Sequence, residues 1–107
     1  MKITVEIDDK SYELEVPPGL SSEAVDFFEK MDADMDCGWQ MSRWWVPDPD
    51  LTQRCQIAAD KLLTAIQKNN SEAALLMCAY ILNKKPFTRR IRVNTEGEIQ
   101  GNEFLED

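Results

Sequence analysis

Polar and apolar side chains alternate along residues 2–16, on both sides of a short polar stretch at residues 8–10. A period of two residues is typical of β-strands that have one buried face and one solvated face. The pattern therefore predicts an antiparallel β-hairpin. Pro17 and Pro18 are expected to end it, because proline has no N–H to donate to a sheet. The alternating apolar positions are Ile3, Val5, Ile7, Tyr12, Leu14 and Val16.

Three helices are predicted after this hairpin. The first is expected to begin at Ser21, whose hydroxyl can cap a helix, and to end near Gly38. The second is expected to begin either at Asp48, with Pro49 at the first helical position, or where Asp50 and Gln53 have the spacing of a capping box, and to end at residues 69–71. Its apolar positions recur at helical spacing, at Leu51, Cys55, Ala58, Leu62 and Ile66.

The third predicted helix contains ten consecutive apolar residues, at positions 73–82. A helix that is apolar on every side is buried on every side, or lies at a subunit interface. A chain of 107 residues has little material with which to cover such a helix. We therefore expect a homodimer that forms through residues 73–82. Ten residues are too few to cross a membrane, which needs about 20.

The last part of the chain is expected to return to β-structure. Residues 90–93 alternate and predict a strand, residues 94–97 a turn, and residues 98–100 a short returning strand. The acidic tail at 101–107 is expected to be flexible, with docking of Phe104 and Leu105 as the alternative. The predicted fold class is α+β, with residues 1–107 in a single domain and the terminal strands completing one small sheet.

The net charge of −8 is distributed unevenly. Residues 1–50 carry 13 acidic and 4 basic groups, whereas residues 51–107 carry 7 acidic and 8 basic groups. An acidic protein repels phosphate backbones, so nucleic acid is not an expected partner. We expect no membrane association and no signal peptide. The three cysteines are odd in number and widely spaced, which is typical of a cytoplasmic protein, and we expect a bacterial one.

The chain contains no histidine. This absence removes the most common general base near neutral pH, the Ser-His and Cys-His nucleophile pairs and most zinc sites. We therefore expect a protein that is not an enzyme and that uses no cofactor.

Residues 31–47 contain all three tryptophans and three of the five methionines, in a segment expected to be a loop. Large apolar side chains in a loop either cover the core or contact a partner, and both alternatives stay open for this segment. Tryptophan, methionine and arginine are enriched in interface centres. The expected function is protein interaction or regulation through the loop at 37–47. The predicted partner-binding residues are Trp39, Met41, Arg43, Trp44 and Trp45, together with Arg89 and Arg90 of a basic run.

The alternative function is metal binding by the segment 31–41. Asp32, Asp34 and Asp36 have the alternation that opens a calcium-binding loop, but the glycine and the glutamate that such a loop needs are missing at the required positions. Soft donors are also present in this segment, at Met31, Met35, Cys37 and Met41, and would favour Cu(I). Both sets are more typical of a solvated helix end and of core packing, so no metal is expected.

Overall fold

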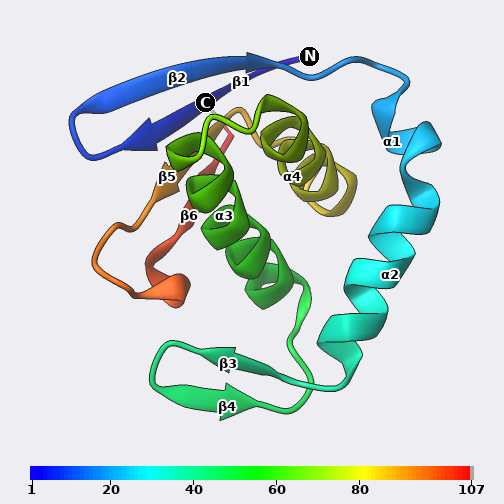
Figure 1. Cartoon of the computed structure of the whole chain (residues 1–107), viewed down its shortest axis with the longest axis vertical. Coiled ribbons are helices and arrows are strands. Elements are labelled where there is room, and N and C mark those ends of the chain that lie inside the picture. The colour runs from blue at the N-terminus through cyan, green and yellow to red at the C-terminus, as the bar shows by residue number, and fades with distance from the viewer. Residues whose placement is uncertain (107) are drawn as a thin grey trace.

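The computed structural model describes residues 1–106 and shows an α+β fold, which confirms the predicted fold class (Figure 1). Within these residues, four α-helices accompany six strands. The larger sheet contains, in spatial order, β2 (Lys10–Glu15), β1 (Lys2–Ile7), β5 (Arg90–Val93) and β6 (Glu103–Leu105). The helices are α1 (Leu20–Glu23), α2 (Val25–Asp36), α3 (Leu51–Gln67) and α4 (Ser71–Lys84).

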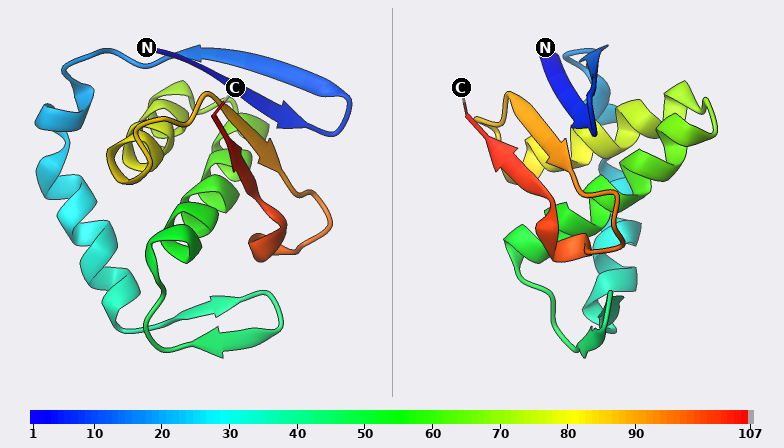
Figure 2. Two further views of the ribbon diagram at one scale, coloured as in Figure 1. Left: turned by 180° about the vertical axis from the view of Figure 1, so that it is seen from behind. Right: turned by 90° about the vertical axis from the view of Figure 1, so that its left-hand side faces the viewer.

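The predicted N-terminal hairpin is present as β1 and β2, which pair antiparallel. The C-terminal β5 pairs with β1 in parallel, and Val5 lies opposite Ile91 in the register. The predicted completion of one sheet by the terminal strands is therefore confirmed. Ile3, Val5 and Ile91 are fully buried on the sheet face that α3 and α4 cover (Figure 2). Burial of such side chains is the main favourable term in the folding of this layer.

The predicted boundary of the central helix is confirmed by its capping hydrogen bonds. The backbone N–H of Gln53 donates to Asp50 Oδ1 at 2.8 Å, and the N–H of Asp50 donates to Gln53 Oε1 at 2.9 Å. The next helix also begins where the sequence predicts a cap, because Asn70 Oδ1 accepts from the N–H of Ala73 at 3.2 Å. Capping groups of this kind satisfy backbone donors that a helix leaves unpaired.

The C-terminal half of helix α4 is buried inside the monomer, whereas Ala73, Leu75 and Leu76 in its N-terminal half are only partly buried. The residues from 77 to 82 are all buried, and the fully buried Tyr80 ring meets the Phe28 ring of α2 edge-on at 5.7 Å. The sheet, α2 and α3 of the same chain supply the cover. The cover is incomplete in the N-terminal half of α4, and the homodimer expected through residues 73–82 stays a prediction.

The predicted first helix differs in its start and is divided. It begins at Leu20 rather than Ser21, and Ala24 separates α1 from α2. The predicted cap by the Ser21 hydroxyl is wrong, because Gly19 occupies the cap position without a side-chain hydrogen bond. The N–H of Leu20 donates to the carbonyl of Pro17 at 3.1 Å, so the turn at the prolines already leads the chain into the helix.

The predicted strand at 98–100 is wrong. Residues Ile99–Gly101 form the 3-10 helix η1, and the returning strand is β6. The Asn94 carboxamide explains the longer turn, because its Oδ1 accepts from the N–H groups of Glu96 at 2.9 Å and Glu98 at 3.1 Å. Residues 103–105 of the tail that was expected to be flexible are thus paired with β5, and residue 107 lies outside the described part. Along residues 1–106 no helix has the length and apolar character that crossing a bilayer requires.

Candidate functional site

The tryptophan-rich segment forms a second sheet rather than the predicted loop. Strands β3 (Trp39–Met41) and β4 (Trp44–Val46) pair antiparallel at one end of the molecule, apart from the larger sheet (Figures 1 and 2). Gly38 and Ser42 have φ angles of 96° and 60°, which let the chain leave α2 and then reverse between the strands. Aromatic and β-branched residues favour β-strands. Each of these strands has only three residues, which is too short for an alternating pattern to be recognised in the sequence.

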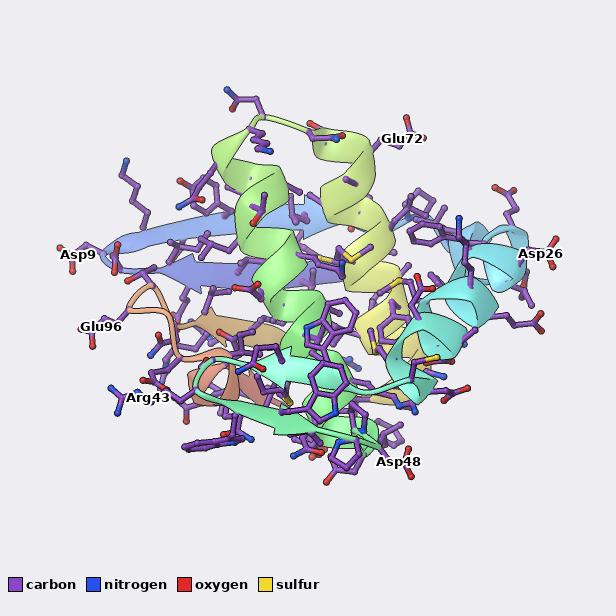
Figure 3. All side chains as sticks on the ribbon, turned by 60° about the horizontal axis from the view of Figure 1, so that its bottom comes forward. Asp9, Asp26, Arg43, Asp48, Glu72 and Glu96 are labelled. Atoms are coloured by element: carbon purple, nitrogen blue, oxygen red, sulfur yellow. The ribbon has the colours of Figure 1, made fainter. Side chains whose placement is uncertain are left out.

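The β3–β4 hairpin is fixed to the rest of the protein at its core face and at its turn. Met41 is fully buried in the hydrophobic core. The Ser42 hydroxyl donates to the carbonyl of Gly97 at 2.7 Å and accepts from the N–H of Ile99 at 2.8 Å. Arg43 lies at the turn, where its Nε is 3.7 Å from Glu98 Oε1 (Figure 3). These contacts hold the hairpin in one orientation.

Trp39 lies where we expect a loop tryptophan that covers the core. It is partly buried and packs against the hydrophobic core. The Nζ of Lys61, on α3, lies 5.0 Å from the centroid of the Trp39 ring, within the range of a cation–π contact. For this tryptophan the sequence hypothesis of a cover over the core is supported.

Trp44 and Trp45 are exposed. The relative accessibility is 54% for Trp44 and 57% for Trp45. Successive side chains of a strand point to opposite faces, so these two rings lie on opposite sides of the hairpin. The Trp45 ring rests against Gly38, because a Cβ added there would lie 2.3 Å from Trp45 Cζ2. Trp45 is therefore both positioned by the chain and open to solvent, and Trp44 exposes a second indole on the other face of the hairpin.

Replacement of Gly38 by alanine is expected to cost about 1–3 kcal/mol through backbone strain and to displace the Trp45 ring as well. The measurement is urea unfolding together with tryptophan emission and acrylamide quenching. Gly97→Ala is the matched control, since Gly97 has a φ of 83° but nothing lies within 4 Å of an added Cβ. We expect altered emission in Gly38→Ala alone. Equal emission spectra for the two variants would show that the Trp45 contact with Gly38 is absent in solution.

Asp32 connects three helices through its carboxylate. It accepts hydrogen bonds from the Tyr80 hydroxyl at 2.6 Å, from Lys84 Nζ at 2.8 Å and from Arg54 Nη1 at 3.3 Å. Burial opposes ionisation of this carboxyl, but hydrogen bonds from Lys84, Tyr80 and Arg54 and the charge of Lys84 outweigh it and lower the pKa of Asp32. Burial also raises the pKa of Tyr80, so its hydroxyl remains a donor. Asp32 therefore has a structural role between α2, α3 and α4.

The three aspartates of the metal hypothesis do not converge. Residues 32 to 36 lie in the continuous helix α2, where alternate side chains point in different directions. Arg54 Nη2 contacts Asp36 Oδ1 at 2.7 Å, and Asp34 is exposed. Among residues 1–106, no three Asp, Glu, Cys or His side chains are grouped closely enough to hold a metal ion.

The sulfur-containing side chains of the same segment also have structural roles. Met31, Met35 and Met41 are buried in the core, and only Cys37 of the predicted soft donors is exposed. Burial raises the pKa of the Cys55 thiol to about 11 and that of the Cys78 thiol to about 12. The thiols of these two cysteines are therefore protonated near neutral pH and pack as small apolar groups.

The basic run lies on the larger sheet and not beside the tryptophans. Arg90 and Arg92 both pair with Glu6 of β1, and Arg92 Nε is 3.1 Å from Glu6 Oε1. Hydrogen bonds from Arg92 and Arg90 lower the pKa of Glu6. Arg89 is exposed and donates to the carbonyl of Thr88. The predicted binding residues thus lie in two separate groups. The alternation of residues in β1 and β5 places Glu6 and Arg92 on one face of the sheet, and our sequence reasoning missed this signal.

Compared with protein-family models, curated proteins and solved structures, the chain shows no match.

Proposed function

We propose that the protein is a small interaction module that contacts another protein through the β3–β4 hairpin. The observation that carries this proposal is the exposure of two indole rings, Trp44 and Trp45, one on each face of the hairpin and each open over more than half of its surface. Tryptophan is among the side chains that contribute most to binding energy when a partner removes it from water. Its ring also offers a large apolar area with few rotatable bonds.

The anchoring of the hairpin supports the proposal energetically. Association costs free energy when flexible side chains and loops must be ordered. Buried Met41 and the two hydrogen bonds of the Ser42 hydroxyl have already fixed the hairpin, so this part of the cost is small. Arg43 at the turn adds an exposed guanidinium to the same surface.

Cytoplasmic location is part of the proposal. All three cysteines are free thiols, and Cys37 is exposed. Exposed free thiols are typical of a reducing compartment. A homodimer through residues 73–82 is also part of the proposal, since Ala73, Leu75 and Leu76 are only partly buried by their own chain. Sedimentation equilibrium of the native protein tests it, and a monomer at micromolar concentration would exclude a stable homodimer.

The experiment is a quantitative pull-down that compares the native protein with a Trp44→Ala, Trp45→Ala double variant. Loss of two binding hot spots should weaken capture of the partner by roughly 30-fold or more. Phe87→Ala is the control, since Phe87 is also exposed but lies in the loop between α4 and β5. Circular dichroism establishes that each variant is folded. Capture of the same proteins in equal amounts by the native and the double variant would show that the hairpin is not the contact surface.

A further inference from the structure

The base of the β3–β4 hairpin is acidic. Residues 34–50, which include the hairpin, contain four aspartates and one arginine. Asp36 ends α2 immediately before the hairpin, and Asp48 follows it, with side-chain exposures of 65% and 88%. Both carboxylates approach the same guanidinium, because Arg54 Nη2 is 2.7 Å from Asp36 Oδ1 and 3.5 Å from Asp48 Oδ1. Two chain segments thus bring negative charge to one place beside β4 (Figure 3).

Arg54 does not complete the neutralisation of this acidic group. Its side chain is only 14% exposed and also donates to the carbonyl of Pro49 and to Asp32. A carboxylate can accept about four hydrogen bonds. Asp36 and Asp48 therefore keep acceptor capacity on their solvent side. The single arginine of residues 34–50, Arg43, lies at the other end of the hairpin from Asp48 (Figure 3).

Trp45 lies three residues before Asp48 in the chain. One side of its ring packs on Gly38, two residues after Asp36, and most of the residue stays exposed. An indole face attracts a lysine or arginine cation through its electron distribution. Another indole of the hairpin, Trp39, already meets a cation in this way, because Lys61 Nζ of α3 lies 5.0 Å from the centroid of its ring. An open indole next to exposed carboxylates favours a cation that also presents apolar surface, which is the character of arginine.

On the basis of the function proposed above, we propose that the partner presents a basic, arginine-bearing segment to this surface. The arginine stacks on the exposed face of Trp45, and its N–H groups donate to Asp48. An acidic segment would be repelled by the same carboxylates. The basic run of a second copy is a poorer occupant, because Arg90 and Arg92 already pair with Glu6 in their own chain.

The test uses two short peptides that differ only in charge. One alternates glycine and arginine, and the other has neutral citrulline in place of each arginine. Calorimetry and tryptophan fluorescence follow the titration of the native protein. We expect the arginine peptide to bind at least about fivefold more tightly, with a difference that shrinks as salt rises. Equal affinity of the two peptides would overturn the proposal.

Paired variants separate a local effect from net charge. Asp48→Asn with Asp50→Asn removes two charges at the hairpin, and asparagine retains the helix cap at position 50. Asp9→Asn with Asp26→Asn removes two charges from parts of the surface away from the hairpin (Figure 3). We expect the first pair to weaken binding of the arginine peptide about fivefold and the second pair to leave it nearly unchanged. Equal losses in the two pairs would show attraction by net charge alone and would overturn the proposal.

The pull-down described above distinguishes the two proposals. Capture that depends on Trp44 and Trp45 but not on Asp48 and Asp50 would overturn the basic partner and leave the interaction surface supported. Capture that depends on neither set would overturn both proposals. The expected result is that capture depends on both tryptophans and on both aspartates, and that the captured segment of the partner contains arginine.

Discussion

Replacement of Asp32 by alanine is expected to lower the free energy of unfolding by about 3 kcal/mol. The Tyr80 hydroxyl and the Lys84 ammonium group lose a shared acceptor at 2.6 and 2.8 Å, and both donors are at least partly buried. Breaking an ion pair from one side costs more than the pair contributes, because it leaves the other group desolvated and unsatisfied. Urea unfolding at neutral pH, followed by circular dichroism, measures the change.

The control for this prediction is Asp34→Ala. Asp34 lies in the same helix and is exposed, so a change within about 0.5 kcal/mol is expected. A loss in Asp32→Ala that is no larger than the loss in Asp34→Ala would contradict the network.

The contribution of Asp32 should depend on pH in a defined direction. Because its pKa is lower in the folded protein than in the unfolded chain, the folded state binds fewer protons in acid. The stabilisation is then fully present above the unfolded pKa of about 3.9 and is lost as pH falls through the folded pKa. Unfolding of the native protein and of Asp32→Asn should be compared from neutral pH into acid. A stability difference that grows below about pH 3.9 would contradict the assigned sign.

Replacement of Met41 by alanine is the second large effect, with an expected cost of about 3 kcal/mol. Met41 is the side chain that the β3–β4 hairpin inserts into the core, and it is fully buried. A cavity at this position should also loosen the hairpin and increase acrylamide quenching of Trp39. Gln40→Ala is the control, since Gln40 is exposed on the opposite face of β3. Equal stability of the two variants would show that the hairpin is not anchored through Met41.

The two stability predictions concern residues that the sequence analysis had connected with a metal. Asp32 and Met41 both belong to the segment 31–41, whose carboxylates and sulfur atoms resemble ligands when read in order. In the structure Asp32 meets cations from α3 and α4, and Met41 meets the core. The partners come from residues about 20 to 50 positions away. Chemistry within one segment cannot reveal such partners, because they depend on how helices pack.

Local patterns were sufficient for the elements whose signals lie within a few residues. The alternation of residues 2–16 predicted the first hairpin, and the pair Asp50 and Gln53 predicted the start of α3. The β3–β4 hairpin was missed, because each strand has three residues and its turn depends on a positive φ at Ser42. The start of the first helix and the position of β6 were misplaced for a similar reason. The start of the first helix depends on a backbone hydrogen bond to the carbonyl of Pro17, and the position of β6 depends on a turn held by the Asn94 carboxamide.

The candidate surface was predicted in part. The sequence identified the tryptophans as its centre, and Trp44 and Trp45 are exposed, whereas Trp39 packs against the core. Arg89 and Arg90 were assigned to the same function, but Arg89 lies immediately before β5 and Arg90 lies in β5 of the larger sheet, where Glu6 binds it. Glu6 and Arg90 are 84 residues apart, and a parallel pairing of β1 with β5 brings them together.

The sequence by itself determined the secondary elements with strong periodicity, the α+β class and the unusual chemistry of residues 31–47. These properties follow from propensity, alternation and capping, which act over a few neighbouring residues. Only the tertiary structure decided which apolar residues are covered by the same chain, which charges neutralise each other and which indole rings stay in water. Those outcomes depend on long-range packing, because burial and ion pairing are properties of surfaces that distant segments share.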